Sequence, residues 1–307
     1  MARYLVSQFF QAVLVVIFVT LVVAVMLRFS GDPAVAQFQG ASAPTAEQLS
    51  EIRQAMGLDK PFSVQYANFL GGVITGDFGT SFRGGRSVGA LIRQALPPTA
   101  LLAFFSLLIS VVLALPLGIH AAVHKGRWAD QVIRLFSLLG LSFPNFWLGI
   151  MLVLIFGVIL KWLPPSGYEG PASLVLPSVT LGLILTSTTV RLLRAALLDV
   201  LGSQYVTVAR SKGLSERTVL YKHALRNTAI PVVTFIGLQF GGLIGGVVVV
   251  EQVFAWPGLG SLALQAIANR DYPVLQGTVT VLAILVVTVN LLVDLSYGLF
   301  DPRVRMA

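Results

Sequence analysis

Long apolar intervals without charged residues alternate with shorter polar segments along this chain of 307 residues. Six intervals stand out, at residues 4–27, 94–124, 135–160, 170–190, 227–250 and 272–293. Each is long enough to cross the roughly 30 Å apolar core of a bilayer, which takes a helix of about 20 residues. The pattern predicts an all-α polytopic membrane protein with six transmembrane helices. The first interval could instead be a signal peptide, but its apolar core exceeds the roughly 7–15 residues of such a peptide, which favours an uncleaved anchor.

Between the first two intervals, residues 29–93 contain helix signals of their own. The residues from Thr45 to Met56 predict a short amphipathic helix that Thr45 caps and that ends before Gly57. A second short helix is expected at about residues 86–95. This region is therefore predicted to be ordered rather than a random loop.

The segment 199–231 is the most charged part of the chain. Its first half has a short apolar face that stops at Gly213, and glycine readily takes the left-handed conformation that ends many helices. Ser215 is then a candidate N-cap for a second amphipathic helix. The basic residues in or just before the segment are Arg191, Arg194, Arg210, Lys212, Arg217, Lys222 and Arg226. We predict a compact knob of helix, glycine turn and helix that lies in water at a membrane surface.

Composition supports the membrane assignment. The chain is 56% hydrophobic and only 11% charged, its mean hydropathy is +0.84, and soluble domains are about 25% charged. The net charge of +8 does not indicate nucleic-acid binding, because the basic residues flank apolar runs and form no face interleaved with aromatic residues. The absence of cysteine excludes disulfides, thiolate zinc sites and cysteine nucleophiles.

Lysine and arginine in the short loops predict how the spans are oriented. They gather at the amino end, in residues 124–134, in residues 191–226 and in the tail, whereas the short loops opposite hold only Lys161 and Arg270. This bias predicts that both termini and the knob are cytoplasmic and that residues 29–93 lie outside.

Prolines and polar side chains inside the apolar intervals mark weak candidates for a transport pathway. Pro116, Pro144 and Pro177 each remove a backbone hydrogen bond and are expected to bend their helices, although membrane helices often tolerate proline. The candidate pathway residues are Phe143, Asn145, Gln239 and Asn290.

Two further features concern helix packing. Overlapping Gly-x-x-x-Gly pairs between Gly237 and Gly246 predict a close helix contact, either within the chain or between subunits. Asp294, near the end of the last interval, is costly in a membrane unless it is paired or wet. We expect it to form a structural ion pair with Arg191 or Arg194.

The chain lacks recognisable catalytic motifs. It has no Gly-x-x-x-x-Gly-Lys-Ser/Thr phosphate loop and no His-Glu-x-x-His metal motif. Its histidines are most simply polar residues at helix ends, and no Ser/His/Asp arrangement is evident. We therefore expect no enzymatic activity, no metal site and no cofactor bound by this chain itself.

The knob carries a resemblance to a known family. The strings Ala-Arg-Ser-Lys-Gly-Leu at 209–214 and His-Ala-Leu-Arg-Asn-Thr-Ala-Ile-Pro at 223–231 resemble the cytoplasmic "EAA" loop of permease subunits in binding-protein-dependent ABC importers. The dipeptide/oligopeptide branch fits best. The strings at 31–34, 76–81, 251–260 and 301–303 extend the resemblance over essentially the whole chain. Thr207, Val208 and Arg226 depart from the general motif in ways that are usual for the peptide branch.

This resemblance implies the type I ABC importer permease fold. It divides the chain into an amino-terminal transmembrane helix (1–28), an extracytoplasmic region with short helices (29–93) and a five-helix core (94–307) that contains the coupling loop 199–228. It places the protein in a bacterial inner membrane, paired with a paralogous permease subunit. Two cytoplasmic ATPase subunits would bind ATP and Mg²⁺, and an extracytoplasmic binding protein would deliver the solute.

The resemblance also implies roles for individual residues. The residues implied to couple to the ATPases are Tyr205, Ala209, Arg210, Lys212, Gly213, Leu214, Ser215, Arg217, Leu225, Arg226 and Asn227. Gly213 would set the turn, Tyr205, Ala209, Leu214 and Leu225 would fill a groove of the ATPase, and Arg210, Lys212 and Arg217 would pair with its acids. The residues implied at the outer gate or the docking surface of the binding protein are Glu251, Trp256, Pro257, Gly258, Arg270 and Asp271.

The solute is the least determined part of this hypothesis. Di- or oligopeptides are the default of the branch, and glutathione, a nickel chelate or another small solute are alternatives. A different class of protein, a membrane channel or sensor, would need no ATPase contact and would tolerate change at Gly213.

Overall fold

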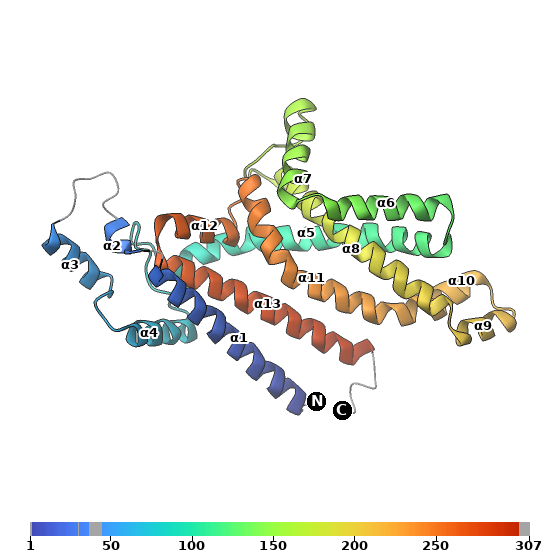
Figure 1. Ribbon diagram of the computed structural model, residues 1–307, viewed down its shortest axis with the longest axis horizontal. Helices are drawn as coiled ribbons and strands as arrows, with labels where there is room; N and C mark the ends of the chain where they lie inside the picture. Colours follow the sequence, from blue (N-terminus) through green and yellow to red (C-terminus); the bar gives the residue numbers. More distant parts are fainter. Residues whose placement is uncertain (1, 30, 37–44, 301–307) are drawn as a thin grey trace. The chain divides into compact units, whose positions relative to one another are not determined.

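The computed structural model describes residues 2–29, 31–36 and 45–300, and the side chains of residues 6–293 within them. The described chain is built from helices joined by turns (Figure 1). The longer helices are α1 (Ala2–Phe29), α4 (Phe62–Thr75), α5 (Val88–Val123), α6 (Trp128–Ser142), α8 (Val175–Leu201), α11 (Leu225–Val253) and α13 (Tyr272–Phe300). The shorter ones are α2 (Pro33–Ala36), α3 (Ala46–Ala55), α7 (Asn145–Leu152), α9 (Gln204–Ser211), α10 (Glu216–Thr218) and α12 (Leu259–Asn269).

The six apolar intervals all correspond to helices. Five helical stretches in the described residues are long and apolar enough to cross a membrane, and the bent pair α6–α7 makes a sixth candidate span. The separate helix expected at 86–95 is wrong, because α5 begins at Val88 and continues through Arg93 to Val123. Arginine is a good helix former, so it ends the apolar interval without ending the helix. Helix α4 was not predicted.

The chain divides into two compact units, each with its own core. One unit contains residues 100–256 and the end of α13 from Thr288, and the other contains residues 2–99 and 257–287. The buried core of the first is Leu102, Leu176, Leu181, Leu243, Val247, Val250, Phe254 and Trp256. That of the second is Leu27, Val88, Ile92, Ala95, Leu259, Ala263, Ala266, Val274 and Leu275.

The predicted cap of α3 is confirmed. The amide of Gln48 donates to the Thr45 hydroxyl at 3.3 Å, and the amide of Thr45 donates to the Gln48 side chain at 3.0 Å. Reciprocal bonds of this kind satisfy two of the backbone donors that a helix start leaves unpaired. Helix α3 thus begins with a cap that its own sequence supplies.

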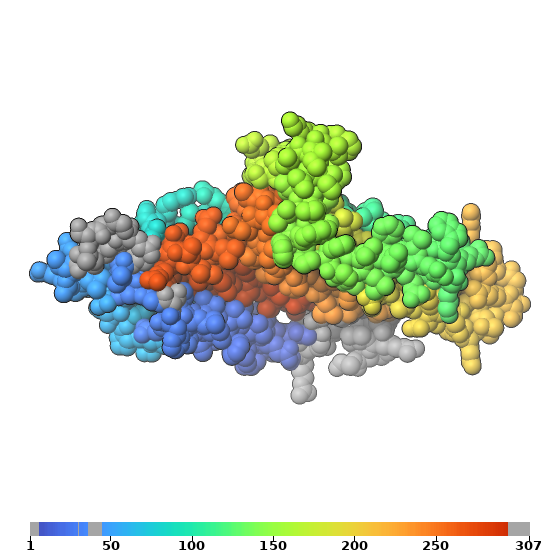
Figure 2. All heavy atoms as spheres, turned by 45° about the horizontal axis from the view of Figure 1, so that its top comes forward, coloured from blue at the N-terminus to red at the C-terminus, as the bar shows by residue number. Residues whose placement is uncertain are grey.

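The third span is sharply broken. Helices α6 and α7 meet at an angle of 103°, and Figures 1 and 2 show α7 turned away from the line of α6. The break follows from Pro144, which forces the preceding residue out of the helical region: Phe143 has φ −89° and ψ 129°. By contrast, α5 runs on through Pro116, and Pro177 lies in the first turn of α8, where its missing N–H costs no helical bond.

Helices α6 and α8 are held together by a buried ion pair. Arg194 donates two hydrogen bonds to Asp130, at 2.6 and 2.7 Å, and the Asp130 side chain is only 1% exposed. The amide of Gly126 donates a third bond to the same carboxylate at 2.9 Å. Arg194 was expected to pair with Asp294, whose side chain lies outside the described residues. The partner found here is Asp130 on a different helix.

The glycines of α11 differ in what surrounds them. A Cβ placed on Gly237 would lie 2.3 Å from a methyl group of Val293 on α13, whereas one on Gly242 or Gly245 would meet nothing within 4 Å. A Cβ on Gly246 would lie 2.9 Å from the Asn145 amide nitrogen. The predicted close contact is therefore internal at Gly237 and Gly246, whereas Gly242 and Gly245 face open space in this chain.

This contrast predicts the effect of two matched substitutions. Gly237→Ala is expected to destabilise the protein by about 1–3 kcal/mol, because overpacking forces the α11–α13 contact apart. Gly242→Ala gains the same helix propensity and meets no neighbour within the chain, so it should be neutral or slightly stabilising. Thermal unfolding of the purified variants in one detergent measures the difference. Equal unfolding temperatures would contradict the close contact at Gly237.

Candidate functional site

Residues 199–228, here called the knob, join the end of α8 to the start of α11 (Figure 1). Its small interior is apolar. Val206 and Val219 are fully buried and Ala209 is 8% exposed, and these three side chains pack together beside Val200 and Leu201. The knob is therefore a packed unit with a small core of its own.

The predicted glycine turn is confirmed. Gly213 has φ +79°, in the left-handed region that side-chain-bearing residues avoid. Around it the Gly213 amide donates to Arg210 O at 2.9 Å and the Leu214 amide donates to Ala209 O at 3.4 Å. Ser215 caps the next helix by accepting from the Thr218 amide at 3.4 Å.

The second helix of the knob is not a separate element. Helix α10 continues through a π-helical stretch, Val219–Ala224, directly into α11. The resulting helical stretch extends from Glu216 to Val253 and includes the fifth candidate span. The part of the knob from Glu216 onward is therefore continuous with that span, whose helix also contains Pro231.

Side-chain bonds brace the knob. The Asn227 amide donates to the Tyr205 hydroxyl at 2.7 Å, linking α9 to the start of α11. Arg210 donates to both carboxylate oxygens of Glu216, at 2.8 and 3.1 Å, across the glycine turn. This hydrogen bond raises the pKa of Arg210 above its usual value, so the guanidinium stays charged.

Other expected coupling residues fall into buried and exposed groups. Ala209 lies on the buried face of α9. Leu225 packs against the cluster of Ala122, Leu197 and Ala224. Both side chains, which were expected to fill a groove of the ATPase, are used in internal packing in this chain, and Leu225 is only partly buried. Arg210 is likewise occupied by Glu216. The expected cations that are exposed and in no ion pair among the described residues are Lys212, Arg217 and Arg226.

The knob also presents large apolar side chains to solvent. These are Tyr205 (42% exposed), Val208 (53%), Leu214 (39%) and Tyr221 (64%). Val208 and Tyr221 were not among the predicted residues. No clear signal in the sequence marked them, because each has an apolar residue one turn away: Tyr205 for Val208, and Leu225 for Tyr221. Exposed apolar groups ringed by charges are typical of a protein-binding surface.

The candidate pathway residues are mostly engaged with neighbouring helices. Gln239 on α11 accepts from the Thr188 hydroxyl at 2.8 Å and donates to the Thr189 hydroxyl at 2.7 Å. Asn145 lies against Gly246, and the Phe143 ring stacks on Trp147 with centroids 4.5 Å apart. Asn290 is half-buried on α13. No hydrogen bond or ring contact joins any two of these four residues in the described part of the chain.

Two of the expected outer residues are buried in the first unit. Glu251 is 0% and Trp256 1% exposed, and the Trp256 indole meets the Tyr168 ring edge to face at 4.7 Å. In this chain by itself neither side chain is offered to a docking protein. They lie in the last turn of α11 and the turn that follows it, where the Trp256 amide donates to Glu251 O at 2.8 Å.

The others lie in the second unit. Pro257 precedes α12, whose N-cap is Gly258, and Arg270 ends this helix with φ +53°. The Asp271 carboxylate accepts from the Ser81 hydroxyl and from the Phe82 amide, the latter at 3.1 Å. Asp271 thus ties the loop after α4 to the start of α13.

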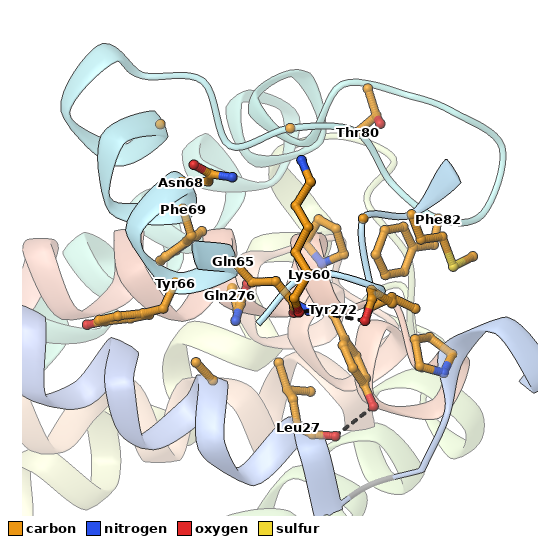
Figure 3. Close-up of a pocket in the computed structure, with 18 of the residues that line it drawn as sticks. Leu27, Lys60, Gln65, Tyr66, Asn68, Phe69, Thr80, Phe82, Tyr272 and Gln276 are labelled. Atoms are coloured by element: carbon orange, nitrogen blue, oxygen red, sulfur yellow. Dashed lines mark hydrogen bonds between the residues drawn. The ribbon is translucent and has the colours of Figure 1, made fainter. Parts of the chain in front are cut away.

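The second unit encloses an open cavity of about 1120 Å³. It is lined by parts of α1, α3, α4, the loop at residues 75–82 and the start of α13. Figure 3 shows polar side chains entering it from separate segments, with Lys60 before α4, Asn68 on α4 and Gln276 on α13. The Tyr272 hydroxyl closes one wall by donating to Leu27 O at 2.6 Å. This cavity was not predicted, because its walls come from distant parts of the chain.

Comparisons with known proteins assign this architecture. The model of the family "Binding-protein-dependent transport system inner membrane component" matches residues 114–306, and the model of its amino-terminal region matches residues 1–103. The chain belongs to this family. It is accordingly a permease subunit of an ABC importer, a multi-pass inner-membrane protein and not an enzyme.

Curated relatives cover almost the whole permease. This chain is 42% identical to the glutathione transport system permease protein GsiC of Salmonella typhimurium strain LT2, over 96% of this chain and 93% of that protein. It is 39% identical to GsiC of Escherichia coli K12, over 97% and 95% respectively.

Solved structures confirm the predicted all-α importer fold. An inward-facing form of the MetNI methionine ABC transporter matches with TM-score 0.59 and 20% identity, over 69% of the permease and 96% of that chain. An amino acid ABC transporter matches with TM-score 0.52 and 16% identity, over 67% and 92%. Membership of a binding-protein-dependent importer family implies ATPase and binding-protein partners for the permease.

Proposed function

We propose that this permease imports small peptides, a class that includes the tripeptide glutathione, and that the knob is its contact with the ATPase subunits. The observation that carries the proposal is the knob's surface of exposed apolar side chains on a packed base that is continuous with α11. In the proposed orientation both termini and the knob are cytoplasmic, in agreement with the distribution of lysine and arginine.

The coupling surface combines apolar anchors with a charged rim. Tyr205, Val208, Leu214 and Tyr221 enter a groove of the ATPase, where burial of aromatic and aliphatic groups supplies most of the affinity. Lys212, Arg217 and Arg226 surround them and steer the partner's acidic groups. Arg210 acts from within, because its bond to Glu216 holds the glycine turn.

Force passes from the knob to the membrane through two helices. When ATP binding closes the two ATPases, the knob moves with them. The helical stretch from Glu216 to Val253 carries this movement toward the outer surface, and α9 passes it to α8 through the short turn at Gly202. Alternating access then follows from rigid helices moving against a second subunit.

The second subunit in this proposal is a paralogous permease. Gly242 and Gly245 are exposed on α11, and a Cβ added to either would meet no neighbour within 4 Å. Small residues allow the close approach of another membrane helix. The cavity of the second unit, with Asp271 holding its loop, is the proposed region where the binding protein docks and releases the solute.

The solute class is supported from two directions. The motifs of the chain resemble the peptide branch of the family, and the relatives named above are permeases of glutathione transport systems. Glutathione and short peptides share amide bonds, an amino group and carboxylates, so one pathway can suit both. A nickel chelate lacks this set of groups and serves as a contrasting solute.

ATPase activity tests the proposal. The complete complex, purified from cells that express its operon and reconstituted in lipid, is assayed with its binding protein empty or loaded with dipeptides, glutathione or a nickel chelate. We expect dipeptides or glutathione to stimulate ATP hydrolysis several-fold over the empty binding protein. Stimulation by the nickel chelate alone would contradict the peptide assignment. A chain that co-purifies with no ATPase would contradict coupling and favour a channel or sensor.

A further inference from the structure

A pocket of about 540 Å³ lies between α6, α8 and α11 in the first unit. Three arginines line it: Arg134 from α6, and Arg191 and Arg194 from α8. Apolar side chains, among them Leu138 and Phe235, form the rest of its wall. This pocket has no part in the roles proposed above for the knob and for the cavity of the second unit.

The helix geometry places two of these arginines at one level. The ion pair of Asp130 with Arg194 joins α6 to α8, and Gly140 meets Ser187 further along the same two helices. The helices are therefore antiparallel. Arg134 follows Asp130 by one turn and Arg191 precedes Arg194 by one turn, so both lie one turn inward from the ion pair.

Charge at this level is unbalanced. The carboxylate of Asp130 is fully engaged by Arg194 and the Gly126 amide. Arg134 and Arg191 are exposed and take part in no ion pair among the described residues. Asp130 also attracts Arg134, but its single negative charge faces three arginines, so the lining of the pocket keeps an excess of positive charge. Such an excess at the edge of a membrane favours a bound anion.

The surroundings fit a lipid better than a solute. Next to Arg134, the side chains of Leu135, Leu138 and Leu139 are 56%, 49% and 41% exposed, which suits contact with acyl chains. The neutral polar group nearest the pocket, Thr188, already donates to Gln239. A peptide solute would thus find cations here but few free neutral partners for its amide groups.

We propose that this pocket binds the phosphate of an anionic phospholipid, with Arg134 and Arg191 as its two cationic ligands. Arginine presents paired N–H donors that match a phosphate, and basic pockets between membrane helices on the cytoplasmic side suit such headgroups. The negative charge of the bound phosphate offsets part of the excess positive charge, and the lipid fastens α6 to α8 beside the ion pair.

Lipid titration of the complete complex tests this site. The delipidated complex in detergent is titrated with phosphatidylglycerol, cardiolipin or phosphatidylethanolamine, and bound lipid is counted by native mass spectrometry. The wild type should bind an anionic lipid about tenfold or more tightly than phosphatidylethanolamine, and the double variant Arg134→Gln/Arg191→Gln should lose most of that preference. Arg134→Lys/Arg191→Lys keeps the charge and should keep part of it.

The control is the double variant Lys125→Gln/Arg127→Gln. It removes the same charge from exposed positions at the start of α6 and outside the pocket, so its lipid preference should equal that of the wild type. Equal lipid binding by the wild type and the pocket variant would overturn the proposal. So would arginine-dependent binding of glutathione or a dipeptide without lipid binding, or binding of inorganic phosphate as tight as that of the lipid. Because ATPase stimulation is not the readout, failure here leaves the proposed transport function standing.

Discussion

Replacing Gly213 with valine is expected to reduce ATP-driven uptake to less than about a tenth of the wild-type rate while leaving membrane insertion intact. The reason is conformational, since Gly213 has φ +79° and an added Cβ would meet no neighbour. A left-handed conformation costs an L-residue about 1–2 kcal/mol, and more when the side chain is β-branched. The valine variant relieves this strain by opening the turn, which moves Leu214 and separates Arg210 from Glu216.

Two control variants separate this effect from a general loss of stability. Asparagine tolerates the left-handed region, so Gly213→Asn should keep most of the uptake. Gly202→Ala alters a second glycine of the knob, one with an ordinary φ of −82°, and should be close to wild type. Uptake is measured in vesicles with the loaded binding protein, and co-purification of the ATPases is measured in parallel. Normal uptake by the valine variant would refute the coupling role of the turn.

Removing the carboxylate of Asp130 is expected to have the largest effect on stability. Asp130→Ala leaves the half-buried guanidinium of Arg194 without its two charged hydrogen bonds. Loss of one partner from a buried ion pair costs about 3–5 kcal/mol, because the remaining charge stays desolvated. We expect a markedly lower unfolding temperature and poor accumulation of the protein in the membrane.

A double-mutant cycle shows whether the pair itself is responsible. Asp130→Asn combined with Arg194→Gln removes both charges and leaves two polar amides in their place. This variant should be more stable than Asp130→Asn alone, since no unpaired charge remains. Thermal unfolding in detergent is measured for the wild type, the two single variants and the double variant. Additive losses in the double variant would show that the two residues stabilise the protein independently.

The two predictions address different links in the same mechanism. The glycine turn shapes the surface that meets the ATPases, whereas the ion pair holds α6 on α8, the helix that leads into the knob. Changing the turn should therefore spoil coupling in a folded complex. Changing the ion pair should reduce the amount of folded complex, with the activity per folded molecule less affected.

Local signals in the sequence determined the membrane spans and the turn of the knob. A span is recognisable because a bilayer demands about 20 apolar residues and leaves charges at the ends. The left-handed turn at Gly213 and the caps at Thr45 and Ser215 were equally predictable, since each depends on residues within four positions of one another. Such features need no knowledge of the rest of the chain.

Only the tertiary structure decided which residues are covered and which are paired. Pro144 breaks its span while α5 continues through Pro116, although both residues looked alike in sequence. Ala209 and Trp256 proved to be buried.

The sequence also did not reveal which charged residues form ion pairs, because Asp130, the partner of Arg194, lies 64 positions away on another helix. Burial and pairing depend on which helices become neighbours, and in a membrane that choice is made by close packing and buried polar bonds rather than by hydrophobicity. The apolar pattern of each span therefore predicts that it is a helix without predicting what it touches.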